Sequence, residues 1–115
     1  MTLNEYQQKA LRTAGEHINK LDRLNNAQCG LCGEAGEFAD LYKKFAHQHA
    51  PYDPERFMKE AGDCLWYIAL AADALGTALD TIAQMNIDKL LKRYPDGYDP
   101  IRSNNRAEGM FDGEK

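Results

Sequence analysis

The sequence predicts an all-α fold, a four-helix bundle that is completed by homo-oligomerisation. Apolar residues recur at spacings of three and four along most of the chain, and strand-like alternation is missing from the sequence. The stretches between the periodic segments are short, which favours antiparallel packing of neighbouring helices. A chain of 115 residues fits one domain with a modest core, and helical proteins of this size often bury more apolar surface against a copy of themselves.

The first two predicted helices cover residues 3–20 and the stretch that ends near residue 47. The apolar stripe of the first helix is Leu3, Tyr6, Ala10, Ala14, Ile18 and Leu21. Asn25 and Asn26 are candidates to cap the second helix. Its apolar face is Leu31, Ala35, Phe38, Tyr42 and Phe45.

The third predicted helix starts at Asp53-Pro54-Glu55 and stops at Gly76. This start combines an N-cap residue, a proline at the first helical position and an acid in the first turn. Thr77 is expected to cap a fourth helix, which Pro95 ends. The chain then divides into a helical domain, residues 1–95, and a polar, loop-like tail, residues 96–115, that could contact the active site.

The composition narrows the class of protein. The formal net charge is −4, and no basic stripe suited to duplex nucleic acid is present. No apolar run approaches the roughly 18 residues that a membrane crossing needs, and the first residues lack a signal-peptide core. We therefore expect a cytoplasmic protein that binds neither duplex nucleic acid nor membrane. Anionic substrates can still bind to an acidic protein through a divalent cation.

Two pairs of acids stand out, Glu34 with Glu37 and Glu60 with Asp63. The members of each pair are three residues apart and therefore project from the same side of a helix. Like charges at this spacing repel each other, so each pair is unfavourable unless another interaction compensates the repulsion. If the two helices are neighbours, four carboxylates surround one point.

The apolar character of the third predicted helix makes the charge of these acids energetically unfavourable. From Asp63 onward it is almost entirely apolar, as expected for a central helix, so Glu60 and Asp63 should face protein. Carboxylates in such a place are stabilised by a hard cation, and Mg²⁺ prefers oxygen ligands and retains sites for phosphates; Mn²⁺ could substitute. Ordinary solvated faces or salt bridges are the alternative interpretation of the four acids. Glycines inside the helical patterns, at Gly30, Gly33, Gly36 and Gly62, suggest close helix packing or room for a ligand.

These residues carry a family resemblance. The E-x-x-E of Glu34 and Glu37, followed by the E-x-x-D of Glu60 and Asp63, resembles the MazG-like branch of the all-α nucleotide pyrophosphohydrolases, which are related to dimeric dUTPases and dCTP pyrophosphatases. The block from Asn86 through Arg93-Tyr94-Pro95 to Gly97 is also similar to that family. The resemblance implies a homodimer or homotetramer that hydrolyses a nucleoside triphosphate between its α- and β-phosphates, with Mg²⁺, to a monophosphate and pyrophosphate. It also implies a house-cleaning or pool-regulating role, metal ligation by the four acids, and Glu34 or Glu37 as the general base.

Candidate substrate contacts lie on the third and fourth helices. Asn86, Lys89 and Arg93 form one stripe, and the two cations could hold phosphates. An ordinary solvated helix end is the alternative for the cations, and a core hydrogen bond is the alternative for Asn86. Tyr67 lies one turn after Asp63 and could touch sugar or base, while Arg106 could reach the site from the tail.

Two competing hypotheses complete the analysis. The first is a non-catalytic helical dimerisation or interaction module, in which the acids form salt bridges. The second is a redox or zinc protein built on the C-x-x-C motif, with Cys29, Cys32, Cys64 and His47 as ligands. No thioredoxin-like pattern surrounds the motif, so we expect these cysteines to be small core or helix-contact residues.

Overall fold

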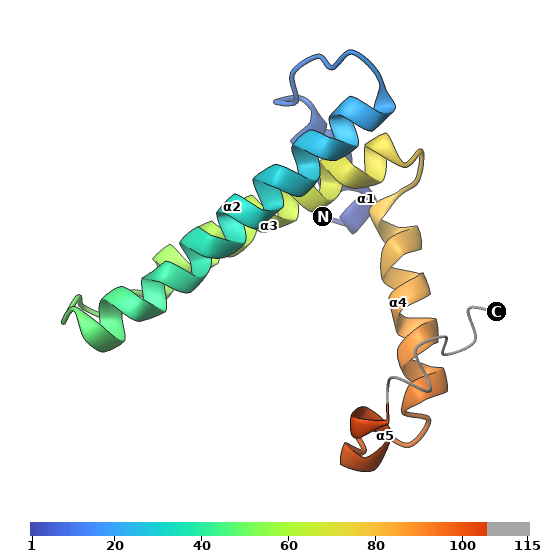
Figure 1. Cartoon of the computed structure of the whole chain (residues 1–115). Coiled ribbons are helices and arrows are strands. Elements are labelled where there is room, and N and C mark those ends of the chain that lie inside the picture. The colour runs from blue at the N-terminus through green and yellow to red at the C-terminus, as the bar shows by residue number, and fades with distance from the viewer. Residues whose placement is uncertain (106–115) are drawn as a thin grey trace. The chain divides into compact units, whose positions relative to one another are not determined.

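The computed structural model describes residues 1–105. The regular secondary structure of those residues is entirely helical, with no strand among them. Five helices follow one another along the chain (Figure 1): α1 (Leu3–Leu11), α2 (Lys20–His47), α3 (Pro54–Ala74), α4 (Leu79–Arg93) and α5 (Pro100–Asn104). The predicted all-α class is thus confirmed. The chain forms two compact units, which divide after Leu79 and are described separately below. The four-helix bundle and its oligomerisation stay predictions.

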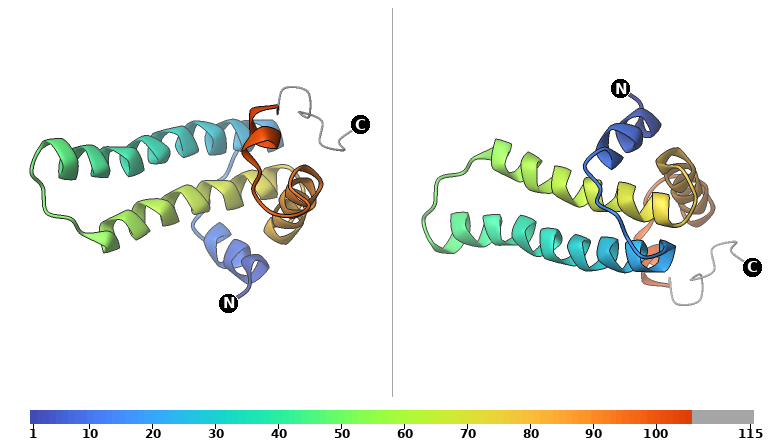
Figure 2. Two further views of the ribbon diagram at one scale, coloured as in Figure 1. Left: turned by 90° about the horizontal axis from the view of Figure 1, so that it is seen from below. Right: turned by 90° about the horizontal axis from the view of Figure 1, so that it is seen from above.

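In the first unit, α2 and α3 form an antiparallel hairpin, and α1 lies across α3 on the side away from α2 (Figure 2). The helix α3 therefore contacts both of the others, as its apolar sequence predicts for a central helix. Its Ala69, Leu70 and Ala72 are fully buried, and Ala27 and Leu41 bury the matching face of α2.

The ends of α3 follow the predicted signals. The Asp53 carboxylate accepts a hydrogen bond from the N–H of Glu55 at 3.1 Å, and Pro54 occupies the first helical position. After the last helical residue, Gly76 has a φ of 70°, a conformation that glycine adopts without strain.

The prediction for the first helix was wrong in length, because α1 ends at Leu11 and a loop of residues 12–19 follows it. Arg23 holds this loop by donating hydrogen bonds to His17 Nδ1 at 3.1 Å and to the Gly15 carbonyl at 2.9 Å, and it also forms an ion pair with Asp73. Ile18, assigned to the apolar stripe, is 90% exposed. These contacts of Arg23 join residues six, eight and fifty positions apart, which a period of three to four residues does not record.

The predicted caps of α2 and α4 were also wrong. Asn19 caps α2 by accepting from the N–H of Asp22 at 2.8 Å, whereas Asn25 and Asn26 lie within the helix. The helix α4 begins at Leu79, two residues beyond Thr77. The N–H of Leu79 donates to Gln7 Oε1 at 2.7 Å, so a buried side chain of α1 satisfies this first amide.

The second unit contains almost all of α4 and the short helix α5. The Asp99 carboxylate caps α5 by accepting from the N–H of Ile101 at 2.9 Å, and Pro100 follows the cap. The expectation of a loop-like tail was therefore wrong for Pro100–Asn104. Arg106 lies outside the described residues. Within residues 1–105, no single helix is long and apolar enough to cross a membrane; α3 and α4 meet that measure only when counted together across their break.

Candidate active site

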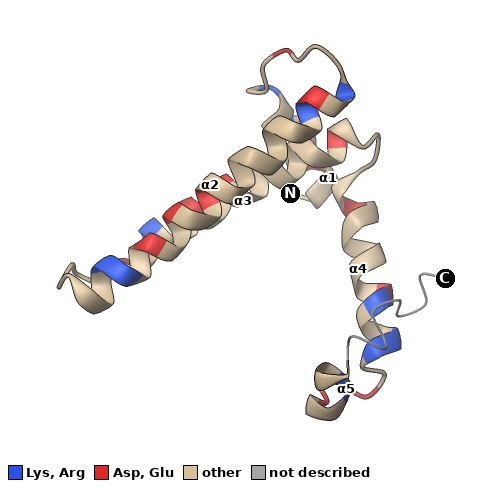
Figure 3. Cartoon of the chain, in the orientation of Figure 1, with Lys and Arg blue, Asp and Glu red and all other residues tan. Residues whose placement is uncertain are grey.

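Three acids from two helices converge in the first unit. Glu34 on α2 and Glu60 and Asp63 on α3 each offer a carboxylate oxygen that lies within 4.8 Å of the others. Figure 3 shows several acidic residues along the middle of α2, with α3 running behind it. Glu37, the fourth predicted acid, lies one turn further along α2 and outside this group. We refer to Glu34, Glu60 and Asp63 as the acid cluster.

The environment of the acid cluster is partly protein and partly solvent. Glu34 and Glu60 are half-buried, whereas Asp63 and Glu37 are exposed. The expectation that Glu60 and Asp63 face protein therefore holds in part for Glu60 and was wrong for Asp63 in this chain. Within residues 1–105, none of the four acids forms an ion pair with a lysine, arginine or histidine of the same chain.

The uncompensated charge has an electrostatic consequence. Partial burial raises the pKa of the Glu34 carboxyl above its ordinary value, and the nearby carboxylates of Asp63, Glu60 and Glu37 raise it further. A hydrogen bond between Glu34 and Glu60 acts in the same direction, because it requires a proton on one of them. An ion with two positive charges would remove this repulsion. The donors are all carboxylate oxygens, which suit Mg²⁺ or Mn²⁺.

A cavity of about 340 Å³ opens directly beside the acid cluster. Glu34 and Asp63 line it together with Trp66 and Tyr67. The structure thus brings Tyr67, a predicted substrate contact, into the same hollow as two of the acids. Carboxylates and aromatic rings in one concave site are a common arrangement for binding a ligand with a charged and an apolar end.

The glycines around the site divide into two kinds. At Gly30, a Cβ atom would lie 2.1 Å from Tyr67 Cε1, so the tyrosine ring occupies the place of a side chain on α2. At Gly33, Gly36 and Gly62, a Cβ atom would meet nothing within 4 Å. Both suggested reasons for the glycines therefore occur: close packing at Gly30, and open space next to the acids at the other positions.

Sequence reasoning overlooked two aromatic residues near the acids. Trp66 lines the cavity, although its place in the apolar stretch after Asp63 is typical of a core residue. Tyr6 on α1 was assigned to an apolar stripe, but burial and the Asp63 carboxylate raise the pKa of its phenol. The position of Trp66 three residues after Asp63 was a usable signal, since it places both on one side of α3. No sequence signal linked α1 to the acids.

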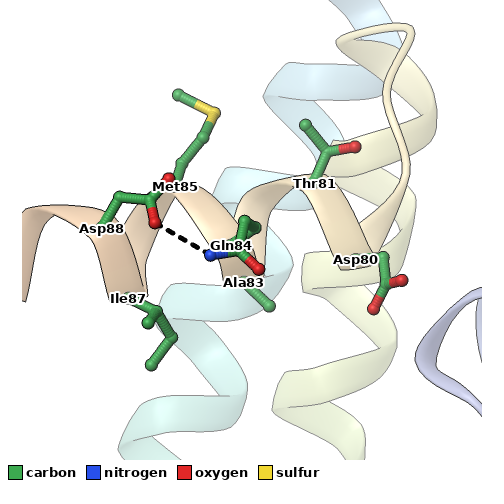
Figure 4. Close-up of a pocket in the computed structure, with 7 residues that line it drawn as sticks. All are labelled: Asp80, Thr81, Ala83, Gln84, Met85, Ile87 and Asp88. Atoms are coloured by element: carbon green, nitrogen blue, oxygen red, sulfur yellow. Dashed lines mark hydrogen bonds between the residues drawn. The ribbon is translucent and has the colours of Figure 1, made fainter.

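The other predicted substrate contacts lie in the second unit. On α4, Asn86 is exposed and Lys89 and Arg93 are half-buried, with the Arg93 guanidinium 5.9 Å from the centre of the Tyr94 ring. A separate hollow of about 480 Å³ runs along α4 (Figure 4), where Gln84 Nε2 donates to Asp88 Oδ1 at 2.8 Å. None of the predicted site residues lines this hollow. The roles of Asn86, Lys89 and Arg93 stay predictions.

The cysteines do not form the zinc centre considered above. Cys29 and Cys32 are exposed on α2, and Cys64 is half-buried on α3. The expectation of core or helix-contact cysteines was wrong for Cys29 and Cys32 in the isolated chain. Within residues 1–105, the acid cluster is the group of His, Cys, Asp and Glu side chains that lies close enough to share an ion, and it includes none of the cysteines.

Comparisons with known proteins show the family to which the sequence is related. The sequence model of the MazG nucleotide pyrophosphohydrolase domain matches residues 24–98. The Gene 37 protein of Mycobacterium phage L5 is 33% identical over 79 residues, which cover 65% of this chain and 69% of the phage protein. No solved structure matches the chain significantly. The matched segment contains all four acids, together with Trp66 and Tyr67, and leaves α1 outside.

Proposed function

The chain belongs to the MazG nucleotide pyrophosphohydrolase family, and we propose that it hydrolyses nucleoside triphosphates, with ribose or deoxyribose, between the α- and β-phosphates. The products are a nucleoside monophosphate and pyrophosphate, and the reaction requires Mg²⁺, which Mn²⁺ can replace. The biological role would be house-cleaning or control of nucleotide pools in the cytoplasm.

One observation carries this proposal, the convergence of Glu34, Glu60 and Asp63 beside a cavity. Three carboxylates within 4.8 Å of one another repel unless a cation or a proton is shared among them. Their oxygens suit a cation that can also bind phosphate oxygens, and a triphosphate brings such oxygens to the site. The open space at Gly33, Gly36 and Gly62 leaves room for that substrate.

The four acids would serve as metal ligands and as the general base. Glu34, Glu60 and Asp63 would hold Mg²⁺, and Glu37 would complete the set after a side-chain rotation on the exposed surface of α2. A cation held there would neutralise charge on the phosphate oxygens and so lower the barrier to attack on phosphorus. Glu34 or Glu37 would accept a proton from the attacking water.

Residues outside the cluster would bind the rest of the substrate. Tyr67 lines the cavity and would contact sugar or base. On α4, Lys89 and Arg93 would contact phosphates and Asn86 would contact the nucleotide, because the three side chains form one stripe. Arg106, outside the described residues, is retained as a contact from the tail.

We also propose that the protein works as a homodimer or as a dimer of dimers. Large apolar side chains are exposed on three helices: Tyr42 is 61% exposed, Met58 67% and Leu91 59%. Contact with a second copy would remove such surface from water.

The competing interaction module would use the acids in salt bridges. Because no such bridge forms among the described residues, the cations would have to come from a partner or from residues 106–115. The nucleotide hydrolase needs no such partner charge, since a metal ion supplies it.

The proposal is tested by measuring pyrophosphate release from a panel of canonical, deoxy and damaged nucleotides, with Mg²⁺ and with excess chelator. We expect release from at least one nucleotide only when the cation is present. If no nucleotide yields pyrophosphate, the interaction module becomes the better explanation. Hydrolysis that continues in chelator would contradict the metal-dependent site.

A further inference from the structure

We propose that Trp66 and Tyr67 form an aromatic wall that receives the nucleobase, and that α1 positions this wall. The inference rests on the proposed function, because it assigns one part of the nucleotide to one side of the cavity. It adds a role for Trp66 and makes α1, which lies outside the matched segment, part of substrate recognition.

Both rings of the wall are held in fixed planes. Trp66 Nε1 donates to the Ala10 carbonyl at 3.1 Å and to Thr13 Oγ1 at 2.9 Å, so the indole is attached to the end of α1. The Tyr67 ring lies over Gly30 on α2. The two rings meet edge to face, with centroids 4.9 Å apart and planes at 86°. A base that stacks on such a wall requires little further ordering of the protein.

The wall and the metal-binding acids share one cavity. The hollow of about 340 Å³ is lined by Trp66 and Tyr67 and also by Glu34 and Asp63. A ligand that satisfies all four residues needs an anionic end that can bind through a cation and a flat, apolar end that can stack. Nucleotides have both ends, whereas inorganic polyphosphates have only the first. The cavity therefore favours a nucleotide over polyphosphate.

The helix α1 is held in place at a second point besides Trp66. Gln7 is 5% exposed, and its side chain donates to the Thr77 carbonyl at 3.1 Å while it accepts from the N–H of Leu79. α1 is therefore bonded to the middle of α3 and to the segment just after it (Figure 2). These bonds fix the position of Ala10 and Thr13, and through them the plane of the indole.

A purely structural Trp66 is the alternative, and fluorescence separates the two roles. Trp66 is the one tryptophan of the chain, so its emission reports on this wall alone. We would titrate the wild-type protein with tripolyphosphate in Mg²⁺. We would titrate it with nucleoside triphosphates either in Ca²⁺ or by rapid mixing in Mg²⁺, so that turnover is limited. Nucleotides should quench the emission, and tripolyphosphate should bind, as seen by calorimetry, with little quenching. Nucleotide binding that leaves the emission unchanged would overturn the aromatic wall while the proposed function stands. If neither ligand binds, both proposals fail.

Substitutions provide a second measurement. Trp66→Leu should raise the KM for nucleotides about 5- to 150-fold, the range expected for loss of one stacking contact, with a much smaller change in kcat. Trp66→Phe retains a ring and should recover most of that loss. Thr13→Val removes one acceptor of the indole N–H and should alter the relative KM values of purine and pyrimidine substrates. Tyr52→Leu, at an exposed ring in the α2–α3 loop, is the matched control and should leave KM unchanged. Equal losses for Trp66→Leu and Trp66→Phe, confined to kcat, would contradict the stacking role.

Discussion

The carboxyl groups of Glu34 on α2 and Glu60 on α3 lie close enough to form a hydrogen bond, which requires a proton on one of the two. This relationship means that the acid cluster can reduce its own repulsion either with a proton or with a cation. Protons and Mg²⁺ should therefore compete for the same carboxylates.

The first prediction concerns pH and stability. The folded-state pKa of Glu34 is raised, so its contribution to stability is present below the ordinary pKa of a glutamate and is lost as pH rises through the raised value. Mg²⁺ should thus raise Tm strongly at neutral pH, and the gain should shrink as pH falls through the raised pKa. Thermal unfolding with and without Mg²⁺ across this range measures the effect. A Mg²⁺ gain that does not vary with pH, or one that persists in Glu34→Gln, would count against the cluster.

The second prediction separates metal ligands from the general base. Asp63→Asn should weaken Mg²⁺ binding and lower turnover about 100-fold or more, because a ligand to the cation is lost. Glu34→Gln should also weaken Mg²⁺ binding, because Glu34 belongs to the acid cluster. Glu37→Gln should lower turnover with a smaller loss of Mg²⁺ affinity, because Glu37 lies outside that cluster. Calorimetry with Mg²⁺ and steady-state kinetics give the two quantities. Unchanged turnover in Asp63→Asn or in Glu37→Gln would remove that residue from the site.

The third prediction uses two glycines of the same helix. Gly30→Ala should lower the free energy of unfolding by about 1–3 kcal/mol, because the new methyl group collides with the Tyr67 ring. Gly33→Ala meets no neighbour and should raise that free energy by about 0.5–1 kcal/mol through better helix propensity. Chemical denaturation measures both. Similar effects of the two substitutions would show that the Tyr67 ring does not rest on Gly30.

The fourth prediction concerns the hydrogen bonds of Gln7 that hold α1 in place. Gln7→Ala should cost about 1–3 kcal/mol of stability, since the Thr77 carbonyl and the Leu79 N–H each lose a partner in a buried place. The neighbouring Gln8 is exposed, so Gln8→Ala is the control and should have little effect. A Gln7→Ala protein as stable as the control would mean that α1 is held by other contacts.

The sequence allowed the acids to be predicted because their geometry is largely local. The spacing of three residues in E-x-x-E and E-x-x-D fixes which side of a helix each acid occupies, and the Asp53-Pro54 start and Gly76 stop define α3. The antiparallel hairpin then brings Glu34 next to Glu60 and Asp63.

The end of α1 and the surroundings of Trp66 could not be predicted in this way. The apolar spacing that continues through Ala14 and Ile18 suggests a longer helix, but Arg23 holds that segment as a loop through hydrogen bonds to residues six and eight positions earlier. The Trp66 indole finds its acceptors at the end of α1 and just after it, more than fifty residues earlier. Such partners depend on tertiary packing, which neither helical period nor local spacing records.

Product analysis of one Mg²⁺-dependent reaction tests the central claim most directly. The wild-type protein, incubated with its best nucleoside triphosphate, should form monophosphate and pyrophosphate in equal amounts, as resolved by phosphorus NMR. Both products should disappear in chelator and in Asp63→Asn. Release of orthophosphate and a nucleoside diphosphate, or equal product formation by Asp63→Asn, would contradict cleavage between the α- and β-phosphates at this acid cluster.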